Sequence, residues 1–113
     1  MDATPAPALD ALTADDRAAI LDAVREFAAT ELTPHAQEWD AAKHFPRDVL
    51  RRAGELGLGG VCVREESGGA GFPRRFAVEI FEELAAGDPT VTAYLTIHNM
   101  VAWMIDTYGD AAQ

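Results

Sequence analysis

One helical stripe in the sequence combines residue types that suit a ligand pocket. Thr92, Thr96 and Asn99 follow one another at spacings of four and three, and Trp103 continues the series four residues later. At about 3.6 residues per turn, these spacings place the side chains along one side of a helix, with Met100 beside them. Hydroxyls, an amide, an indole and a thioether can line an apolar cavity with a few polar contacts. The alternative is an ordinary core, in which the threonines bond to carbonyls one turn earlier.

The segment over residues 65–72, E-E-S-G-G-A-G-F, raises the question of a phosphate-binding loop. Such a loop needs a lysine and a serine or threonine directly after its glycines. Here two glutamates precede the glycines, and Phe72-Pro73 follows them. The segment therefore favours a loop with unusual backbone angles over a phosphate cradle.

The titratable residues show no pattern of a catalyst. His35, His44 and His98 do not share the spacing of metal ligands, so each is expected to be an ordinary surface or core histidine. Adjacent glutamates such as Glu82-Glu83 point in different directions, which suits a solvated face better than an acid/base pair. The residues alone thus predict a helical domain with a candidate pocket, no catalytic residue and no metal site.

The charge balance of the chain is strongly acidic. Its 113 residues include nine basic and nineteen acidic side chains, a formal net charge of −10. This charge argues against binding nucleic acid or an anionic membrane through a positive field. Cys62 is the only cysteine, which excludes an intrachain disulfide and favours a reducing cytoplasm. The first residues also lack the basic start and apolar run of a secretory signal.

Four helical segments must position the stripe, and a flexible tail is expected before them over residues 1–12. The first helix should begin at Thr13, and Pro34 should kink it on its way to Trp39. Two further helices are expected over residues 46–56 and 74–86, each followed by a glycine that can end it. Residues 61–63 should form a buried extended connector, too short to make a sheet.

The last helix, residues 88–108, is expected to be the centre of the fold. Asp88 suits the N-cap, and Pro89 suits the first helical position. Apolar residues then occupy nearly every face, so the pattern predicts no wide solvent side. Polar residues interrupt the apolar run well short of the roughly 18 residues of a membrane span. The predicted fold is all-α, an antiparallel bundle of about four helices with no substantial sheet, in one domain over residues 13–113.

Three segments of the chain are familiar as a set. They read E-L-G-L-G-G-V-C-V-R-E-E-S-G-G-A-G-F, then E-I-F-E-E-L-A-A-G-D-P-T-V, and finally D-T-Y-G-D-A-A-Q. In order and spacing they resemble the N-terminal helical domain of the acyl-CoA dehydrogenases, and the resemblance covers residues 13–113. Within the family, residues 94–106 look most like the short branched-chain members, the isobutyryl-CoA dehydrogenase type.

The resemblance implies an FAD enzyme that oxidises a short or branched acyl-CoA to its trans-2-enoyl form and passes electrons to an electron-transfer flavoprotein. The family's glutamate base lies in its C-terminal helical domain, and most FAD contacts come from that domain and the middle β-domain. This chain alone is therefore expected to be inactive and to retain no flavin. By correspondence with the family pattern, Thr92, Thr96 and Met100 form the far wall of the acyl-tail pocket, and Leu95 and Asn99 lie next to them.

The family pattern continues beyond Gln113, which implies a fragment, a gene-model remnant or one piece of a longer enzyme. The isolated chain is expected to expose apolar surface and to self-associate. Two other classes stay open, a free-standing helical module that binds a protein partner and a carrier that holds an acyl group. An in-frame segment like T-E-P-x-x-G-S-D downstream in the DNA would favour the enzyme, and an immediate stop codon would favour the other two.

Overall fold

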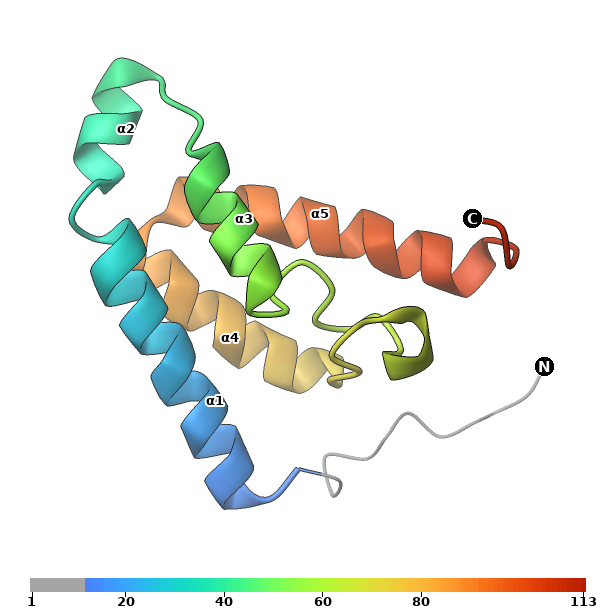
Figure 1. The fold of residues 1–113 in the computed structure, drawn as a ribbon. Helices are drawn as coiled ribbons and strands as arrows, with labels where there is room; N and C mark the ends of the chain where they lie inside the picture. Colours follow the sequence, from blue (N-terminus) through green and yellow to red (C-terminus); the bar gives the residue numbers. More distant parts are fainter. Residues whose placement is uncertain (1–11) are drawn as a thin grey trace.

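The computed structural model describes residues 12–113, which form five α-helices and no β-strand (Figure 1). The all-α prediction is confirmed, whereas the tail predicted over residues 1–12 lies, apart from Leu12, outside the described residues. A π-helical segment, η2, continues the first helix, and a 3-10 turn, η3, lies in the loop before α4. The elements are α1 (Ala14–Phe27), η2 (Ala28–Leu32), α2 (Ala36–Ala42), α3 (Arg47–Glu55), η3 (Glu65–Ser67), α4 (Arg74–Gly87) and α5 (Pro89–Tyr108).

Local sequence signals set the starts of α1 and α5, as predicted. The Thr13 hydroxyl accepts a bond from the Asp16 amide at 3.0 Å, and the Asp16 carboxylate accepts one from the Thr13 amide at 3.3 Å. This reciprocal pair satisfies two amides that the helix itself leaves free. At α5, the Asp88 carboxylate accepts from the Thr90 amide at 2.9 Å, and Pro89 occupies the first turn.

The helix is interrupted at Pro34 and does not continue with a kink, so the prediction of a kink was wrong. Residues 33–35 form a turn, and α2 begins only at Ala36. Pro34 has no amide hydrogen to donate to the carbonyl four residues earlier, so the α-helical bond pattern cannot pass through it. The wider π turn supplies a partner just before the break, since the Thr33 amide donates to the Ala28 carbonyl at 2.9 Å. One expected helix is therefore two, which raises the number from four to five.

The core lies around α4, which packs against α1 and η2 on one side and against α5 on the other. The side chains of Phe76, Ile80 and Leu84 are almost completely buried and recur on one face of α4 at helical spacing. Gly87 ends that helix and allows it to approach η2 closely, because a Cβ there would lie 3.1 Å from the Cβ of Leu32. The close approach of these two elements closes the core at the end where α5 begins.

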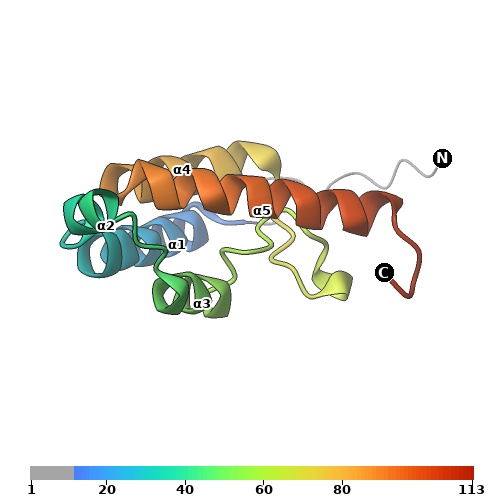
Figure 2. The same ribbon diagram turned by 90° about the horizontal axis from the view of Figure 1, so that it is seen from above.

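The helix α5 lies at the edge of the molecule, so the prediction that it has no wide solvent side was wrong for this chain. Figure 2 looks onto a side of α5 that no other described element covers along most of its length. The other described elements supply neighbours for one face of α5 only, on which Val91, Thr92, Leu95 and Asn99 are buried. None of the described helices has the length and apolar content needed to cross a bilayer. Seven large apolar side chains elsewhere on α5 are between 46% and 77% exposed: Tyr94, Ile97, Met100, Val101, Met104, Ile105 and Tyr108.

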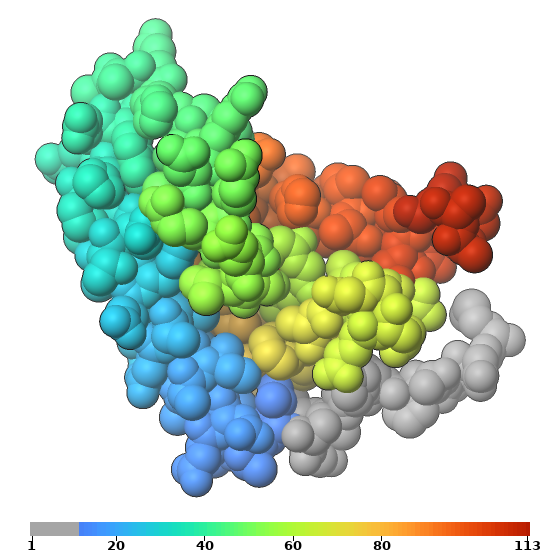
Figure 3. All heavy atoms as spheres, in the orientation of Figure 1, coloured from blue at the N-terminus to red at the C-terminus, as the bar shows by residue number. Residues whose placement is uncertain are grey.

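The loop between α3 and α4 contains the segment predicted as a buried extended connector. Val61 and Val63 are indeed buried, but residues 61–63 form turns. Their carbonyls accept bonds from the returning chain, Val61 from the Phe72 amide at 2.9 Å and Val63 from the Gly71 amide at 2.8 Å. The loop thus folds back on itself, and in Figure 3 it lies, in green and yellow, against the C-terminal half of α5.

Candidate functional site

The structure divides the five predicted pocket residues into two groups. Thr96, Asn99 and Met100 line a groove between α4 and α5 with a volume of about 590 Å³. Thr92 and Leu95 lie in the core instead, 5% and 3% exposed. Among the stripe residues, only those from Thr96 onward therefore face the groove. The remaining groove residues are Arg74, Ala77, Val78 and Phe81 of α4, Trp103, Met104 and Tyr108 of α5, and Cys62 of the loop.

Both threonine hydroxyls of the stripe bond within the helix. Thr92 donates to the Asp88 carbonyl at 2.8 Å, and Thr96 donates to the Ala93 carbonyl at 2.7 Å. These are bonds of the kind that the ordinary-core alternative predicts. A ligand beside Thr96 would therefore meet a hydroxyl whose proton is already committed, which leaves only its acceptor lone pairs. That part of the groove suits an apolar group better than a hydrogen-bonding one.

Asn99 fastens the loop after α3 to the middle of α5. Its amide nitrogen donates to the carbonyls of Leu58 and Leu95, both at 2.8 Å, and its oxygen accepts from the Val61 amide at 2.8 Å. These bonds use both amide protons, and the residue is only 8% exposed. Asn99 thus acts on the groove indirectly, because it holds in place the loop that carries Cys62.

The groove itself is mainly apolar, with one cation at its edge. The Arg74 guanidinium lies 4.2 Å from the centre of the Trp103 ring, and that ring meets the Tyr108 ring edge-on at 6.0 Å. Met100 projects from the middle of α5 with about half of its surface exposed. Burial raises the pKa of the Cys62 thiol, although the charge of Arg74 opposes this effect. The thiol is therefore protonated at neutral pH and is not an activated nucleophile.

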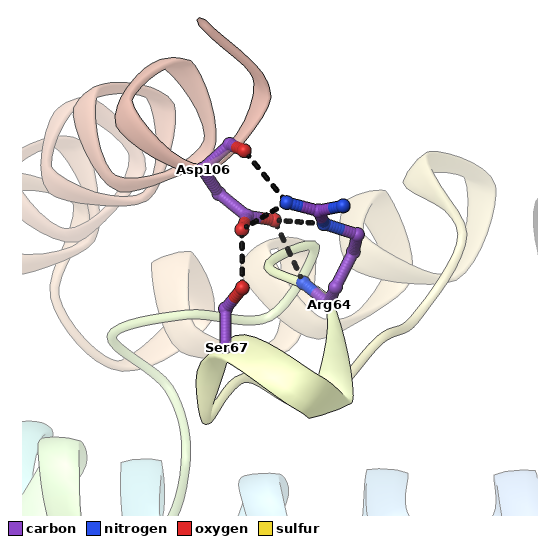
Figure 4. Close-up of polar contacts among 3 residues, drawn as sticks. All are labelled: Arg64, Ser67 and Asp106. Atoms are coloured by element: carbon purple, nitrogen blue, oxygen red, sulfur yellow. Dashed lines mark hydrogen bonds and ion pairs between the residues drawn. The ribbon is translucent and has the colours of Figure 1, made fainter. Parts of the chain in front are cut away.

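A polar cluster that the sequence patterns did not indicate joins η3 to the end of α5 (Figure 4). The Arg64 guanidinium donates to both carboxylate oxygens of Asp106, at 3.0 Å and 2.9 Å, and the Arg64 amide donates to the same carboxylate at 3.1 Å. The Ser67 hydroxyl donates to it as well. The Arg64 guanidinium, followed by the Ser67 hydroxyl, holds the pKa of Asp106 well below its usual range, so the carboxylate is ionised at neutral pH.

The glycines of residues 65–72 form the internal hydrogen bonds and tight turns of the loop that carries Arg64 and Ser67. The Gly68 amide donates to the Glu65 carbonyl at 2.9 Å, the Gly69 amide to the Arg64 carbonyl at 3.0 Å, and the Gly71 amide to the Val63 carbonyl. Gly68 and Gly71 also adopt positive φ angles, which explains why glycine is needed there. With its amides bonded internally, the loop offers no cradle for the phosphates of a nucleotide.

Comparison with known proteins identifies the family of the chain. The model named "Acyl-CoA dehydrogenase, N-terminal domain" matches residues 14–113. The chain belongs to the acyl-CoA dehydrogenase family. The resemblance seen in the three sequence segments is thereby confirmed, and the isobutyryl-CoA type is represented among the similar proteins. Acyl-CoA dehydrogenases are oxidoreductases that generally use FAD.

Three similar proteins illustrate how much of an acyl-CoA dehydrogenase this chain represents. It is 49% identical to the mitochondrial isobutyryl-CoA dehydrogenase of Dictyostelium discoideum over 78% of this chain and 21% of that protein. The corresponding enzyme of Bos taurus is also 49% identical, over 77% of this chain and 21% of its own length. The glutaryl-CoA dehydrogenase of Desulfococcus multivorans is 36% identical over 79% and 24%. The chain thus spans about a fifth to a quarter of the length of these relatives.

The residues of the described chain do not by themselves fit FAD. The one glycine-rich loop has its amides bonded internally, and the groove beside Met100 is walled by apolar and aromatic side chains with Arg74 as its single cation. A dinucleotide needs donors for its pyrophosphate and a surface for its ring system. Within residues 12–113, neither feature meets these needs.

Proposed function

We propose that this chain is the N-terminal helical domain, residues 13–113, of an FAD-dependent acyl-CoA dehydrogenase that acts on a short or branched acyl-CoA. In this proposal the chain supplies a wall of the acyl-tail pocket. The catalytic base and most contacts to FAD lie in a middle β-domain and a C-terminal domain beyond Gln113. The observation that carries the proposal is the family match over residues 14–113, together with the 49% identity to two isobutyryl-CoA dehydrogenases.

The chemistry of the groove supports an acyl tail as its occupant. Thr96 and Met100 face it from α5, and most other lining groups are carbon or ring surfaces. The net charge of −10 disfavours the CoA phosphates near this domain, whereas an uncharged acyl tail is indifferent to it. Thr92 and Leu95 then act from one layer further inside, since they set the position of the helix that forms the wall.

The exposed side of α5 supports the idea of a longer enzyme. Seven large apolar side chains on one helix form a surface of the kind that marks an interface. We propose that the middle and C-terminal domains cover it in the complete enzyme. Burying the exposed half of each side chain would contribute roughly 1 kcal/mol. Without those domains, the same surface should cause the isolated chain to self-associate.

The test is a chimera in which residues 13–113 replace the N-terminal helical domain of the Bos taurus isobutyryl-CoA dehydrogenase. The chimera should retain FAD and should bleach it on addition of isobutyryl-CoA, with an electron-transfer flavoprotein as acceptor for turnover. The controls are the enzyme without any N-terminal helical domain and the isolated chain, which should retain no flavin and show no activity. A chimera that folds and binds FAD but oxidises no acyl-CoA would contradict the proposal.

The location of this enzyme in the cell stays a prediction. The single cysteine favours a reducing compartment, and the cytoplasm is the location proposed here. The names of the two isobutyryl-CoA dehydrogenases place those proteins in mitochondria. Fractionation of the source cells with an antibody against the chain would decide between the two compartments.

A further inference from the structure

The guanidinium at the edge of the groove between α4 and α5 has no acceptor within residues 12–113. The side chain of Arg74 is exposed and forms neither a hydrogen bond nor an ion pair with the described residues. It lies over the Trp103 ring instead, 4.2 Å from the ring centre. A guanidinium held over a ring keeps the N–H groups in its own plane free for an acceptor. Arg74 therefore presents a positioned set of donors at the edge of the groove.

The groove extends from this cation along an apolar stretch of α5. The helices α4 and α5 run side by side in opposite directions, which places the start of α4 beside the end of α5 (Figures 1 and 2). Thr96 precedes Trp103 by two helical turns, or about 10 Å, and both residues line the groove. Met100 lies between them, and Phe81 of α4 lines the same groove. The groove thus combines an apolar length with a cation at one end.

From this arrangement we propose that the groove binds a free aliphatic acid of short to medium length in its ionised form. The carboxylate accepts hydrogen bonds from Arg74, and the hydrocarbon chain packs along Met100 and Phe81. The fork of an arginine matches the two oxygens of a carboxylate, and the thioether and ring surfaces suit a hydrocarbon chain. The ligand is a free acid and not a thioester, so the inference does not depend on the dehydrogenase reaction.

The charges around the groove permit an anion there, although the chain as a whole is acidic. The described residues that line the groove include no aspartate or glutamate. The net charge of −10 is spread over the whole chain, and physiological salt screens charges beyond about 8 Å. Burial raises the pKa of the Cys62 thiol, and the charge of Arg74 opposes that rise, so the positive charge acts inside the groove. The field at this edge of the groove is therefore set by Arg74.

The experiment is an NMR titration of the full chain with sodium hexanoate and, in parallel, with 1-hexanol and hexylammonium chloride, at constant ionic strength. The indole N–H of Trp103 should shift and saturate with hexanoate. The indole N–H of Trp39, which does not line the groove, should not shift and serves as an internal control. The alcohol should bind about three- to fivefold more weakly, in the range of an exposed ion pair, and the cation more weakly still. Equal or tighter binding of the alcohol would overturn the proposal, and so would an absence of saturable shifts at Trp103.

A pair of substitutions on adjacent residues locates the carboxylate. Arg74→Gln should abolish the preference for hexanoate over 1-hexanol, because the two probes then differ in a charge that has no partner. Arg75→Gln removes the same charge at the next position, outside the groove lining, and should retain the preference. Equal losses in the two variants would show a general charge effect and overturn the site.

A second pair of substitutions locates the hydrocarbon chain. Met100→Ala removes apolar surface from the middle of the open groove and should weaken hexanoate and 1-hexanol alike, by about threefold. Val101→Ala, on an exposed part of α5 outside the groove lining, should leave both affinities unchanged. If Met100→Ala changes neither affinity, the chain does not lie along the groove and the proposal fails. Thermal unfolding of each variant confirms that the measurement is made on folded protein.

These measurements need neither FAD nor turnover, so their outcome is separate from that of the chimera. Failure of hexanoate to bind would leave the proposed dehydrogenase function standing. An inactive chimera would likewise leave the carboxylate site standing.

Discussion

Two polar clamps join the loop between α3 and α4 to the helix α5, and they differ in nearly every physical respect. The first is Asn99, a neutral and almost fully buried amide that bonds the carbonyl of Leu58 and the amide of Val61. The second is the Asp106 carboxylate, whose main partner, the Arg64 side chain, is 61% exposed. Both clamps hold the same loop, but the second is sheltered on one side only, because the Asp106 side chain is 7% exposed whereas Arg64 is open to water.

The difference indicates which clamp contributes most to the stability of the loop and which one contributes less. Buried groups that lose a hydrogen-bond partner pay the full cost of desolvation, whereas an ion pair with one exposed member, here Arg64, can exchange part of its bonding for water. The Asn99 clamp is therefore expected to be essential for the loop, and the Asp106 clamp to be a smaller and condition-dependent addition. The groove lies between them, so variants of all three regions test this comparison.

The largest effect is expected for Asn99→Ala. The change leaves the Val61 amide and the Leu58 carbonyl without partners in a buried site, each at a cost of about 1–3 kcal/mol. The free energy of unfolding in urea should fall by about 3 kcal/mol, and hydrogen exchange at the Val61 amide should accelerate by the equivalent factor, on the order of 100-fold. A loss below about 1 kcal/mol would mean that water replaces the amide.

The matched control for Asn99→Ala is Thr96→Val on the same helix. Thr96 contributes one hydroxyl bond to the Ala93 carbonyl, and valine has a similar shape without the hydroxyl. The expected loss is about 1 kcal/mol or less, since the helix retains its backbone bonds. Comparable losses of unfolding free energy in the two variants would show that the bonds of Asn99 to the loop contribute no more than an ordinary side-chain hydrogen bond.

The second effect in size concerns the groove and rests on the proposed function. Met100→Ala in the chimeric enzyme shortens the wall and makes room for one or two more methylenes, each contributing about 0.8 kcal/mol when buried. The ratio of kcat/KM for n-valeryl-CoA to that for isobutyryl-CoA should rise about three- to tenfold. Steady-state kinetics with the two substrates measures this change.

The control for Met100→Ala must lie away from the groove and from the clamps. Glu79 is unsuitable because it pairs with Arg17 at 2.6 Å, but Glu82 on α4 is exposed and forms no ion pair among the described residues. Glu82→Ala should leave the preference for acyl length unchanged. If Met100→Ala lowers stability with no change in that preference, Met100 does not border the acyl tail.

The sequence was most informative where the structure depends on local chemistry. Thr13 and Asp88 cap their helices as predicted, because capping involves residues only two or three positions apart. Pro34 was recognised as an obstacle, but local rules did not decide between a kink and a break with a π turn. The apolar pattern of α5 also could not predict its exposure. The pattern indicates that the helix needs a neighbour, but not whether this chain supplies that neighbour.

The candidate site was predictable in part for the same reason. Helical spacing correctly grouped Thr96, Asn99 and Met100 on one side of α5, where they border a common groove. The bonds from Asn99 to Leu58 and Val61 span about forty residues. The spacing of residues within one helix could therefore not predict them. The Arg64–Asp106 pair is 42 residues apart and was missed entirely, because nothing in the sequence singles out these two charges among many.

A smaller effect is expected for Asp106→Asn, which retains the shape of the exposed clamp and removes its charge. The opening of residues 64–67, measured by hydrogen exchange, should accelerate up to about fivefold at low salt, in the range of exposed ion pairs. In 1 M NaCl the difference from the native chain should shrink, because screening weakens the pair with Arg64. The effect of Asn99→Ala should hardly change with salt, so a parallel response of the two variants would remove the distinction between the clamps.

The smallest effect is the pH dependence of the same clamp. The pKa of Asp106 is lower in the folded chain than its unfolded value of about 3.9, so its contribution to stability is fully present above that value. The contribution is lost as the pH falls below about 4 toward the folded pKa, because the unfolded state then binds the proton more readily. The difference in unfolding free energy between the native chain and Asp106→Asn should therefore be constant from pH 5 to 7 and should narrow below about pH 4. The difference for Asn99→Ala should stay constant throughout, since an amide does not titrate. If the Asp106→Asn difference is the same at pH 3 as at pH 6, the carboxylate gains nothing from Arg64 and Ser67, and the second clamp contributes no stability through its charge.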